Sequence, residues 1–396
     1  MKKRQVHFVA NCVYADHVAG GDIHFFNMAQ ATVEAGYPLH FFGGHALQGH
    51  LQRRKIDATL TLTDLQQAKG INMESLGGQI RLFNDYRGRL RGTLRQLNEI
   101  GPEDMAYSVT DYWFDTLPVI KSKAKRKLMV LGMDAPSLKQ VITRTRPDVA
   151  ASRINSIYYW TSQNLSLLRF QRLPNKRLFY VHPSMEPRLL NIGYAKSEIV
   201  FISNGFDLET AESVPDQQEE YDVVWVGRYH RQKGIDDLLA TLRTLAQQVK
   251  GFRAVFVGKL ENDLRPAVEA AGLGANVHFA GLVSEYEKFR LFKASRLFLM
   301  PSTYESWGIV IGEALACRIP VVAYDLAAYR PIFGDLVNYV PCFDLKQFQD
   351  AASRVLLNAR SGKVELNERD LQKLKDEHSW AAARKRFQRT LDEFAQ

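Results

Sequence analysis

Short apolar runs alternate with amphipathic segments through the second half of the chain, and this alternation limits the possible folds more than any other feature. The apolar runs lie at 222–226, 254–258, 277–280, 297–300 and 320–323. Helical periodicity fills the intervals, notably at 235–249 and 284–294. Strands separated by helices of this length predict a parallel sheet that is covered by helices on both faces.

The amino-terminal end of the chain repeats this arrangement. Residues 5–11 form a strand-like run, residues 22–35 have helical periodicity and residues 39–42 form a second apolar run. Gly36 is expected to end the helix as its C′ residue. The loop after the first run lacks Gly-x-Gly-x-x-Gly, so this Rossmann-like opening does not indicate a dinucleotide cofactor. Weaker patterns predict helices at 76–100 and 153–168 and strands at 106–110, 127–131, 176–183 and 199–202.

The length of 396 residues predicts two domains. The turn signal Asn204-Gly205 is followed by a polar, acidic stretch at 215–220 whose composition suits a linker. We therefore expect a first domain at 1–207, a linker at 208–220, a second domain at 221–378 and a separate last helix within 379–396.

Composition places the chain among globular proteins, since 46% of its residues are hydrophobic and 24% are charged. It contains no run of eighteen apolar residues, so no transmembrane helix is predicted. The basic start is followed by an apolar run too short for a signal peptide. The three cysteines, Cys12, Cys317 and Cys342, have neither metal nor redox spacing, which favours reduced thiols in the cytosol.

The net charge of +9 is concentrated in two basic segments, 81–95 and 121–127. Such segments attract phosphates on nucleic acid or on anionic lipid, and the alternative is a solvated basic surface. We find no zinc finger and no aromatic ribonucleoprotein signature, so no nucleic-acid partner is expected.

Two glutamates, Glu305 and Glu313, stand eight residues apart between the apolar runs 297–300 and 320–323. A Gly-containing turn between them is predicted to open a helix, which makes the segment a βαβ unit. The free N–H groups at a helix N-terminus favour a phosphate, and a carboxylate nearby can bind a sugar hydroxyl. The alternative for the pair alone is one loop glutamate and one exposed helix glutamate.

A second motif follows the first strand of this half, where Gly227-Arg228 precedes Lys233-Gly234. Arg228 offers a planar fork of donors and Lys233 a point charge, and both suit phosphate oxygens. An ordinary surface role is the alternative. Gly227 is expected to let the chain turn sharply.

Together these motifs resemble the retaining glycosyltransferases of the GT-B fold in glycosyltransferase family four, which carry a Glu-x7-Glu signature. The resemblance implies that Glu305 lies beside the donor sugar, that Glu313 binds the nucleotide ribose and that Arg228 and Lys233 neutralise the diphosphate. It assigns the catalytic roles to Glu305, Arg228 and Lys233, and donor binding to Gly20, Gly21, Gly227, Val283, Trp307, Gly308, Ile309 and Glu313.

The resemblance also implies an architecture of two Rossmann-like domains whose parallel sheets face each other across a cleft. The segment at Ser379-Trp380 is similar to the start of a family helix that crosses back and packs on the first domain. One departure concerns a first-domain histidine that many relatives carry, because the matching loop here reads Gly-Met-Asp-Ala at 132–135. Asp134 in that loop is either a ligand of the sugars or a helix N-cap.

The expected activity is hexosyl transfer from a nucleotide diphosphate sugar, with retention, to a glycan, glycolipid or lipid-linked acceptor. UDP is the default nucleotide, with GDP as the alternative. We find no zinc spacing and no Asp-x-Asp motif, so neither a metal nor a cofactor is expected. The rival interpretations are a phosphorylase or epimerase of the same fold, and a non-catalytic protein that binds sugar nucleotides or polyanions.

A cytoplasmic protein that associates peripherally with the membrane is expected from segment 81–95. Arg87, Arg91 and Arg95 are spaced four apart, on one helical face, and four leucines form an apolar side: Leu82, Leu90, Leu94 and Leu97. A basic amphipathic helix of this kind lies on an anionic leaflet. The alternative is that the leucines pack inside the first domain while the arginines are solvated.

Overall fold

The structure is a computed structural model that describes residues 3–13, 20–64, 76–143, 153–259, 261–364 and 366–396. The described residues form two compact units. Unit 1 contains those up to Thr143, residues 153–203 and residues 383–396, and unit 2 contains those within 204–382. Each unit is described by itself.

Unit 1 is built on a seven-stranded sheet of order β3-β2-β1-β4-β5-β6-β7, in which neighbouring strands are parallel. The strands are β1 (Val6–Ala10), β2 (Leu39–Gly43), β3 (Thr59–Leu62), β4 (Met105–Ser108), β5 (Arg126–Leu131), β6 (Lys176–Tyr180) and β7 (Ile199–Phe201). The helices are α1 (Gly20–Glu34), α2 (His45–Arg54), α3 (Leu76–Arg95), α4 (Trp113–Lys121), α5 (Leu138–Thr143), α7 (Arg153–Gln171), α8 (Glu186–Ile192) and α17 (Trp380–Ala395), which enters unit 1 at Ala383.

Buried aromatic side chains fill the core of unit 1. The ring of Phe8 on β1 lies 5.2 Å from that of Phe41 on β2 and 4.6 Å from that of Tyr107 on β4. The ring of Phe387 on α17 lies 5.6 Å from Tyr107 and 5.1 Å from Phe179 on β6. The last helix of the chain therefore completes the core of unit 1, as the resemblance implied.

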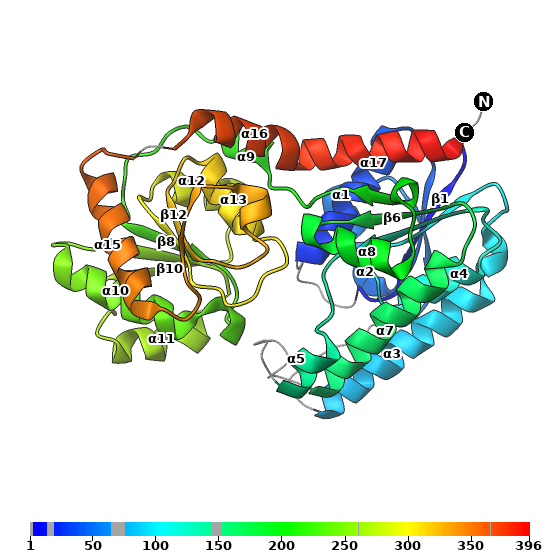
Figure 1. Cartoon of the computed structure of the whole chain (residues 1–396), viewed down its shortest axis with the longest axis horizontal. Coiled ribbons are helices and arrows are strands. Elements are labelled where there is room, and N and C mark those ends of the chain that lie inside the picture. Colours follow the sequence, from blue (N-terminus) through cyan, green and yellow to red (C-terminus); the bar gives the residue numbers. More distant parts are fainter. Residues whose placement is uncertain (1–2, 14–19, 65–75, 144–152, 260, 365) are drawn as a thin grey trace. The chain divides into compact units, whose positions relative to one another are not determined.

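Unit 2 has a six-stranded parallel sheet of order β10-β9-β8-β11-β12-β13. The strands are β8 (Val223–Val226), β9 (Ala254–Val257), β10 (Val277–Gly281), β11 (Phe298–Met300), β12 (Val321–Tyr324) and β13 (Val337–Val340). The helices are α9 (Leu208–Ser213), α10 (Ile235–Gln248), α11 (Glu261–Ala270), α12 (Glu285–Lys293), α13 (Ile309–Ala316), α14 (Arg330–Phe333), α15 (Leu345–Arg360) and α16 (Glu368–His378). Figure 1 shows α10, α11 and α15 on one face of the sheet and α12 and α13 on the other.

The expected strands and the helices of the second half are present, but two edge strands were missed. β3 reads Thr-Leu-Thr-Leu and is partly exposed along its length. β13 reads Val-Asn-Tyr-Val and is buried only at its two ends. Edge strands face solvent on one side, so their sequences lack the continuous apolar run that marks a central parallel strand.

The linker expected at 208–220 does not begin as a linker. Asp207 accepts a hydrogen bond from the Thr210 backbone N–H (3.0 Å), and this cap starts helix α9. Ala211 of α9 is buried in unit 2, and the chain passes from unit 1 to unit 2 after Ser203 rather than after Asp207.

The basic segments are more structural than expected. Arg89 is buried and donates to the carbonyl oxygens of Asn11 (3.1 Å) and Val13. Lys127 is also buried, and its Nζ donates to the carbonyl oxygens of Ile120 (2.6 Å) and Ser122 (3.0 Å). These two cations satisfy backbone groups inside unit 1, so neither contributes to a basic surface.

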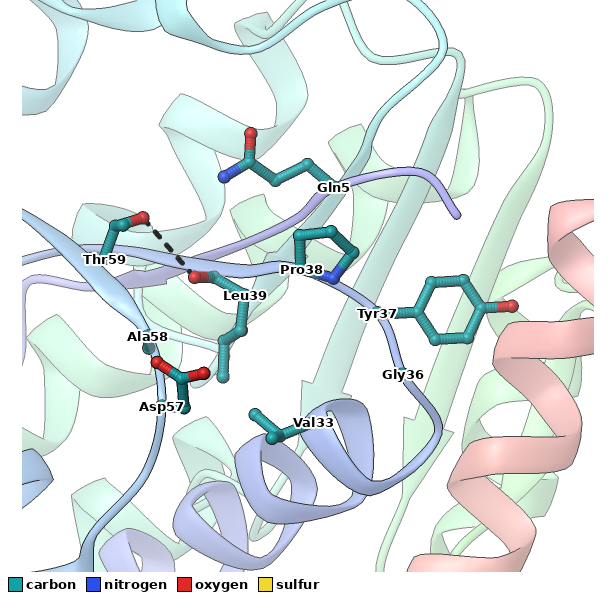
Figure 2. A pocket seen from close by; sticks show the side chains of 9 residues that line it. All are labelled: Gln5, Val33, Gly36, Tyr37, Pro38, Leu39, Asp57, Ala58 and Thr59. Carbon is teal, nitrogen blue, oxygen red and sulfur yellow. Dashed lines mark hydrogen bonds between the residues drawn. The ribbon is translucent and has the colours of Figure 1, made fainter. Parts of the chain in front are cut away.

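One pocket opens at the amino-terminal ends of the strands of unit 1 (Figure 2). Its lining includes Gln5 just before β1, Leu39 at the start of β2 and Asp57 and Thr59 around the start of β3. The Thr59 hydroxyl donates to the Leu39 carbonyl oxygen (3.4 Å). Ligands of open parallel sheets bind at the opposite, carboxyl end, and none of the expected site residues lines this pocket.

Candidate active site

The expected site residues of unit 2 follow the carboxyl ends of three strands of its sheet. Gly227 follows β8, Val283 follows β10, and the loop 301–308 follows β11. In a parallel sheet these ends lie at one edge, which is where open α/β sheets bind their ligands. The topology therefore gathers residues that are far apart in the sequence.

Two loops at this edge are tied together by backbone contacts. The Thr303 N–H donates to the Gln232 carbonyl oxygen (2.8 Å). Gly234 has φ 63°, and a Cβ there would lie 2.0 Å from the carbonyl oxygen of Pro301. Only glycine fits this approach, so Gly234 fixes the spacing between the β8–α10 loop and the β11–α13 loop.

That spacing brings Lys233 against Glu305. The Lys233 Nζ donates to Glu305 Oε1 at 2.5 Å, and the side chains are 13% and 14% exposed. A charge-assisted hydrogen bond of this kind is strong and orients both groups. The cation and the carboxylate that the sequence assigned to the diphosphate and to the sugar are thus direct neighbours.

Arg228 lies in the same loop and is exposed. The described part of the chain contains no ion pair that involves Arg228, so its guanidinium is available to an anion. We expected Gly227, just before Arg228, to allow a sharp turn, but the structure shows a different reason for glycine at this position. A Cβ at Gly227 would lie 2.8 Å from the ring of Trp225, so the residue is small because that ring covers it.

The loop 301–308 ends in a glycine that starts helix α13. Gly308 has φ 86°, and a Cβ there would lie 2.8 Å from the Tyr329 ring. The helix begins at Ile309, and the first N–H groups of a helix have no intrahelical acceptor. The Trp307 side chain is buried against Phe333, with ring centroids 5.3 Å apart, which leaves only its backbone for a ligand.

Glu313 lies on α13 and is buried, with only 5% of its surface exposed. The alternative of an exposed helix glutamate is therefore wrong. Its Oε1 accepts a hydrogen bond from Lys288 Nζ (2.7 Å), and the same Nζ donates to Glu285 Oε2 (2.7 Å). Burial alone would lower the Lys288 pKa, but these two carboxylates raise it. Burial raises the pKa of Glu313, and Lys288 opposes that rise.

Lys288 is a site residue that the sequence analysis missed. It stands on α12, and its neighbours Phe289, Leu291 and Phe292 are all buried. The signal available in the sequence was a lysine four residues before Phe292, on an apolar helical face. A buried cation requires a buried partner, and here that partner is the second glutamate of the motif.

Two other expected donor-binding residues, Gly20 and Gly21, open helix α1 of unit 1. A Cβ added to Gly21 would meet no atom within 4 Å, so packing does not demand glycine there. The preceding residues 14–19 lie outside the described part of the chain. Val283 of unit 2 is half-buried in the loop that leads into α12.

Asp134, in the loop that lacks the family histidine, pairs with Arg188. Arg188 Nη1 donates to Asp134 Oδ1 at 2.6 Å and to Gln163 Oε1 at 2.7 Å. Helix α5 begins only at Leu138, so the N-cap interpretation of Asp134 is wrong. The carboxylate is instead held by a cation at the carboxyl edge of the unit 1 sheet.

Two buried aspartates support neighbouring loops at this edge. Asp111 accepts from Gln163 Nε2 (2.8 Å), and burial raises its pKa to about 7. Asp115 accepts from the Asn11 N–H (2.7 Å) and the Thr110 hydroxyl (2.6 Å), and burial raises its pKa to about 7. Asp115 therefore fixes the backbone after β1, and Asp111 holds the Gln163 side chain, which also bonds the Met133 carbonyl oxygen.

The described residues contain neither a candidate metal cluster nor a candidate membrane-spanning helix. No group of three or more His, Cys, Asp or Glu side chains there is arranged to hold a metal ion. None of the described helices is both long and apolar enough to cross a membrane.

Solved structures share this fold over the whole chain. A sucrose-phosphate synthase from Thermosynechococcus elongatus aligns with a TM-score of 0.71 at 17% identity over 99% of both chains. The Anabaena protein HepE in complex with UDP aligns with a TM-score of 0.68 at 15% identity, over 98% of this chain and 100% of its own. With its two parallel sheets, the chain has the GT-B fold of glycosyltransferases.

Residues 208–369, which lie within unit 2, match the family model described as glycosyl transferases group 1. A phosphatidyl-myo-inositol mannosyltransferase of Mycobacterium leprae is 32% identical over 172 residues, which are 41% of this chain and 45% of the relative. An alpha-D-kanosaminyltransferase of Streptomyces kanamyceticus is 29% identical over 138 residues, 34% of this chain and 36% of the relative. The chain thus spans less than half the length of these curated relatives.

Proposed function

We propose that the protein transfers a hexosyl group from a nucleoside diphosphate sugar to a sugar or lipid-linked acceptor, with retention of configuration. The observation that carries the proposal is the Lys233–Glu305 pair beside the start of α13. It combines a cation, a carboxylate and a helix N-terminus at one sheet edge, within the region that matches the family model.

Charge development explains the role of each group. When the bond between the sugar and the diphosphate breaks, negative charge grows on the leaving phosphate oxygen. Lys233, Arg228 and the first N–H groups of α13 stabilise that charge, without a metal ion in this proposal. Glu305 binds the donor sugar and stabilises positive charge near its anomeric carbon. The acceptor oxygen forms the new bond to the anomeric carbon, and its proton passes to the leaving diphosphate oxygen.

Glu313 binds the ribose of the donor nucleotide in this proposal. UDP is the preferred nucleotide because the solved Anabaena neighbour is in complex with UDP, and GDP is the alternative to test. A lipid-linked acceptor is supported by relatives whose names describe transfer to phosphatidyl-myo-inositol. These properties belong to the relatives and support the proposal for this chain.

The proposed acceptor places the protein at the cytoplasmic face of a membrane, and unit 1 has a surface suited to that. Leu82 on α3 is buried and the other three leucines of its expected apolar side are half-buried, so they pack inward. Other apolar side chains of α3, α5 and α7 are exposed. Helix α3 contacts α7 through Phe83 and Tyr158, whose ring centroids lie 5.6 Å apart. The proposed apolar surface is made of the exposed side chains Ile80, Phe83, Leu138, Ile142 and Ile157.

Basic side chains are exposed on two of these three helices. They are Arg81 and Arg87 on α3 and Lys139 on α5. Apolar side chains that enter a leaflet, beside cations that attract its anionic headgroups, make a peripheral membrane site. Figure 1 shows the start of α3 and the start of α7 near α5, at one end of unit 1.

Sedimentation with vesicles of phosphatidylglycerol and phosphatidylcholine tests the membrane site. We expect binding at low salt that weakens at high salt, and loss of binding in a Phe83→Ser/Ile142→Ser variant. Leu190→Ser is the matched control, because Leu190 is also exposed in unit 1 but lies on α8. Equal sedimentation of the double variant and the wild type would refute the site.

Nucleotide binding and release test the catalytic proposal. The wild type should bind UDP or GDP in calorimetry and release that nucleotide from its glucose or mannose conjugate. Glu305→Gln should retain nucleotide binding and lose most of the release, since Glu305 acts on the sugar. Glu313→Gln should weaken nucleotide binding itself, because a ribose bond exists in ground and transition states alike. A wild type that binds neither nucleotide would contradict the proposal.

A further inference from the structure

Lys288 lies between two carboxylates in a buried part of unit 2, where an unpaired charge would cost free energy. Its Nζ lies 2.7 Å from Glu313 Oε1 and 2.7 Å from Glu285 Oε2, and its side chain is 11% exposed. Glu285 is the more exposed partner, with 63% of its side chain in contact with solvent. Burying such a pair contributes little stability compared with apolar side chains of similar volume. Stability alone therefore does not explain why this pair is buried.

The second oxygen of Glu313 gives that reason. Glu313 Oε2 is buried and receives no hydrogen bond from any described residue. A buried carboxylate oxygen without a donor costs free energy, so such oxygens normally have a partner. The groups that face Glu313 electrostatically are Lys288, Glu285 and Asp207, and Lys288 is the cation among them. The open oxygen therefore requires a donor from outside the protein.

The position of this oxygen identifies the kind of donor. Glu313 is the fifth residue of α13, whose first residues form the proposed phosphate site. Lys288 stands on α12, directly after the β10–α12 loop at the same sheet edge. A ligand whose phosphate lies at the start of α13 presents its adjoining ribose hydroxyls to this region. Hydroxyl groups are donors that a carboxylate oxygen accepts.

We propose that Lys288 is a positioning residue that holds the Glu313 carboxylate with Oε1 occupied and Oε2 open to a ribose hydroxyl, and so makes the site specific for ribonucleotides. The inference rests on the proposed function, because it concerns the nucleotide part of the same donor. A site built to accept a hydroxyl discriminates against an analogue that lacks it, since its buried acceptor is then unpaired.

Lys288, Glu285 and Glu313 should therefore differ in what their removal does to nucleotide binding. Removal of the Lys288 side chain leaves both Glu313 carboxylate oxygens without a donor, so the carboxylate is no longer held with Oε2 toward the ligand. Removal of Glu285 leaves the Lys288–Glu313 bond in place. A purely structural Lys288 would affect stability without altering the preference between two nucleotides.

Calorimetry on the full chain tests this with a nucleotide and its analogue. The probes are UDP and 2′,3′-dideoxy-UDP, or the guanine pair if GDP binds the wild type more tightly. We expect the wild type to prefer the ribonucleotide by about 10- to 100-fold, the range of a hydrogen bond to a charged group. In Lys288→Met the ratio should fall toward one, because the bond that positions Glu313 is lost.

Matched variants separate positioning from folding. Lys288→Gln serves if Lys288→Met does not fold, with the same expected loss of preference, and Lys288→Arg should restore most of it. Glu285→Gln should keep the wild-type ratio. Lys293→Met removes a lysine from the same helix, and it should also keep the ratio because Lys293 bonds the Val214 carbonyl oxygen instead.

Two results overturn the inference. One is a folded Lys288→Met or Lys288→Gln variant with the wild-type ratio between ribonucleotide and dideoxynucleotide. The other is a wild type that binds UDP or GDP but does not discriminate against the dideoxy analogue, which leaves the proposed function intact. A wild type that binds neither nucleotide would instead remove the proposed function, and this inference with it.

Discussion

The two units share one architecture but use charge differently at the carboxyl edges of their sheets. In unit 1 the charged groups Arg89, Asp111 and Asp115 are buried and bonded to backbone or side-chain partners within the unit. In unit 2 Lys233 and Glu305 bond each other across two loops, and Arg228 is exposed. The same edge is thus internally satisfied in one unit and open to an anion in the other.

This difference agrees with the comparisons, because the family model matches only within unit 2. The motifs that resemble the family also concentrate there. Charge at the edge of unit 1 contributes to folding, whereas charge at the edge of unit 2 contributes to the proposed chemistry. Each prediction below changes one side of this comparison.

The largest effect is expected in unit 1, where Arg89 lies between two carboxylates. Its Nη2 lies 2.8 Å from Asp85 and 3.6 Å from Asp64, and its side chain is 2% exposed. Arg89→Met should lower the free energy of unfolding by about 3–5 kcal/mol, because it leaves buried carboxylates without their cation. Urea unfolding followed by circular dichroism measures this. Arg91→Met, an exposed neighbour on α3, should change it by less than about 0.5 kcal/mol.

The next effect is on turnover in unit 2. Lys233→Ala should lower turnover about 10²–10³-fold, the usual cost of removing one group that stabilises a developing anion. Its urea midpoint should fall less than that of Arg89→Met, because the Lys233 and Glu305 side chains are 13% and 14% exposed whereas the Arg89 side chain is 2% exposed. Lys250→Ala, which removes an exposed lysine of the same unit, is the control. Wild-type turnover in Lys233→Ala would contradict the catalytic role of Lys233, and with it the proposed difference between the charges of the two units.

A smaller effect concerns pH and two histidines on adjacent strands of unit 1. His40 Nδ1 lies 3.0 Å from His7 Nδ1, and His40 Nε2 lies 3.0 Å from the Thr61 hydroxyl. Burial, with His7 as a lesser cause, lowers the pKa of His40 from 6.5 to about 4. The unfolded chain therefore binds a proton at a pH where the folded chain does not.

Stability should consequently fall as the pH falls from 6.5 toward 4. For His40 this amounts to about 1–2 kcal/mol between pH 6.5 and pH 5. Asp111 and Asp115 act in the opposite direction, because their pKa values near 7 make the folded chain bind protons that the unfolded chain releases. The difference between wild type and His40→Gln isolates the histidine. Parallel stability curves for the two proteins from pH 7 to pH 5 would show that His40 does not titrate this way.

The smallest effect is expected from chelation. Under the proposed function, protein cations offset the diphosphate charge, so EDTA should leave the rate of nucleotide release within about twofold of the untreated rate. Loss of activity that magnesium or manganese restores would assign the charge of unit 2 to a metal instead.

Much of unit 2 was predictable because its central strands are continuous apolar runs and its loops contain charged pairs at fixed spacing. The strand β8 and the motif around Lys233 and Glu305 are examples. Edge strands such as β3 were not predictable, since half-exposed Thr-Leu alternation resembles a loop. Lys288 was missed because its role depends on a contact with Glu313, twenty-five positions away in the sequence, which only the fold creates.

The basic segment 81–95 shows the same limit. Its arginine spacing predicted the helix, but spacing alone does not distinguish a cation that faces water from one that faces carbonyl oxygens. Arg91 is exposed, and Arg89 two positions earlier is buried. The direction of each side chain is set by packing of α3 on its neighbours, which involves residues far along the chain.

Helix α17 has a consequence for how the protein is made. Phe387 packs in a core with Phe8 and Tyr107, which are translated before any residue of unit 2 that the structure describes. A ribosome therefore synthesises all of the described residues of unit 2 before unit 1 acquires this core side chain. During synthesis unit 2 has all of its described residues before unit 1 does. The order of completion is the reverse of the order of translation, so a stop codon shortly after residue 382 would damage the part of the protein that was translated first.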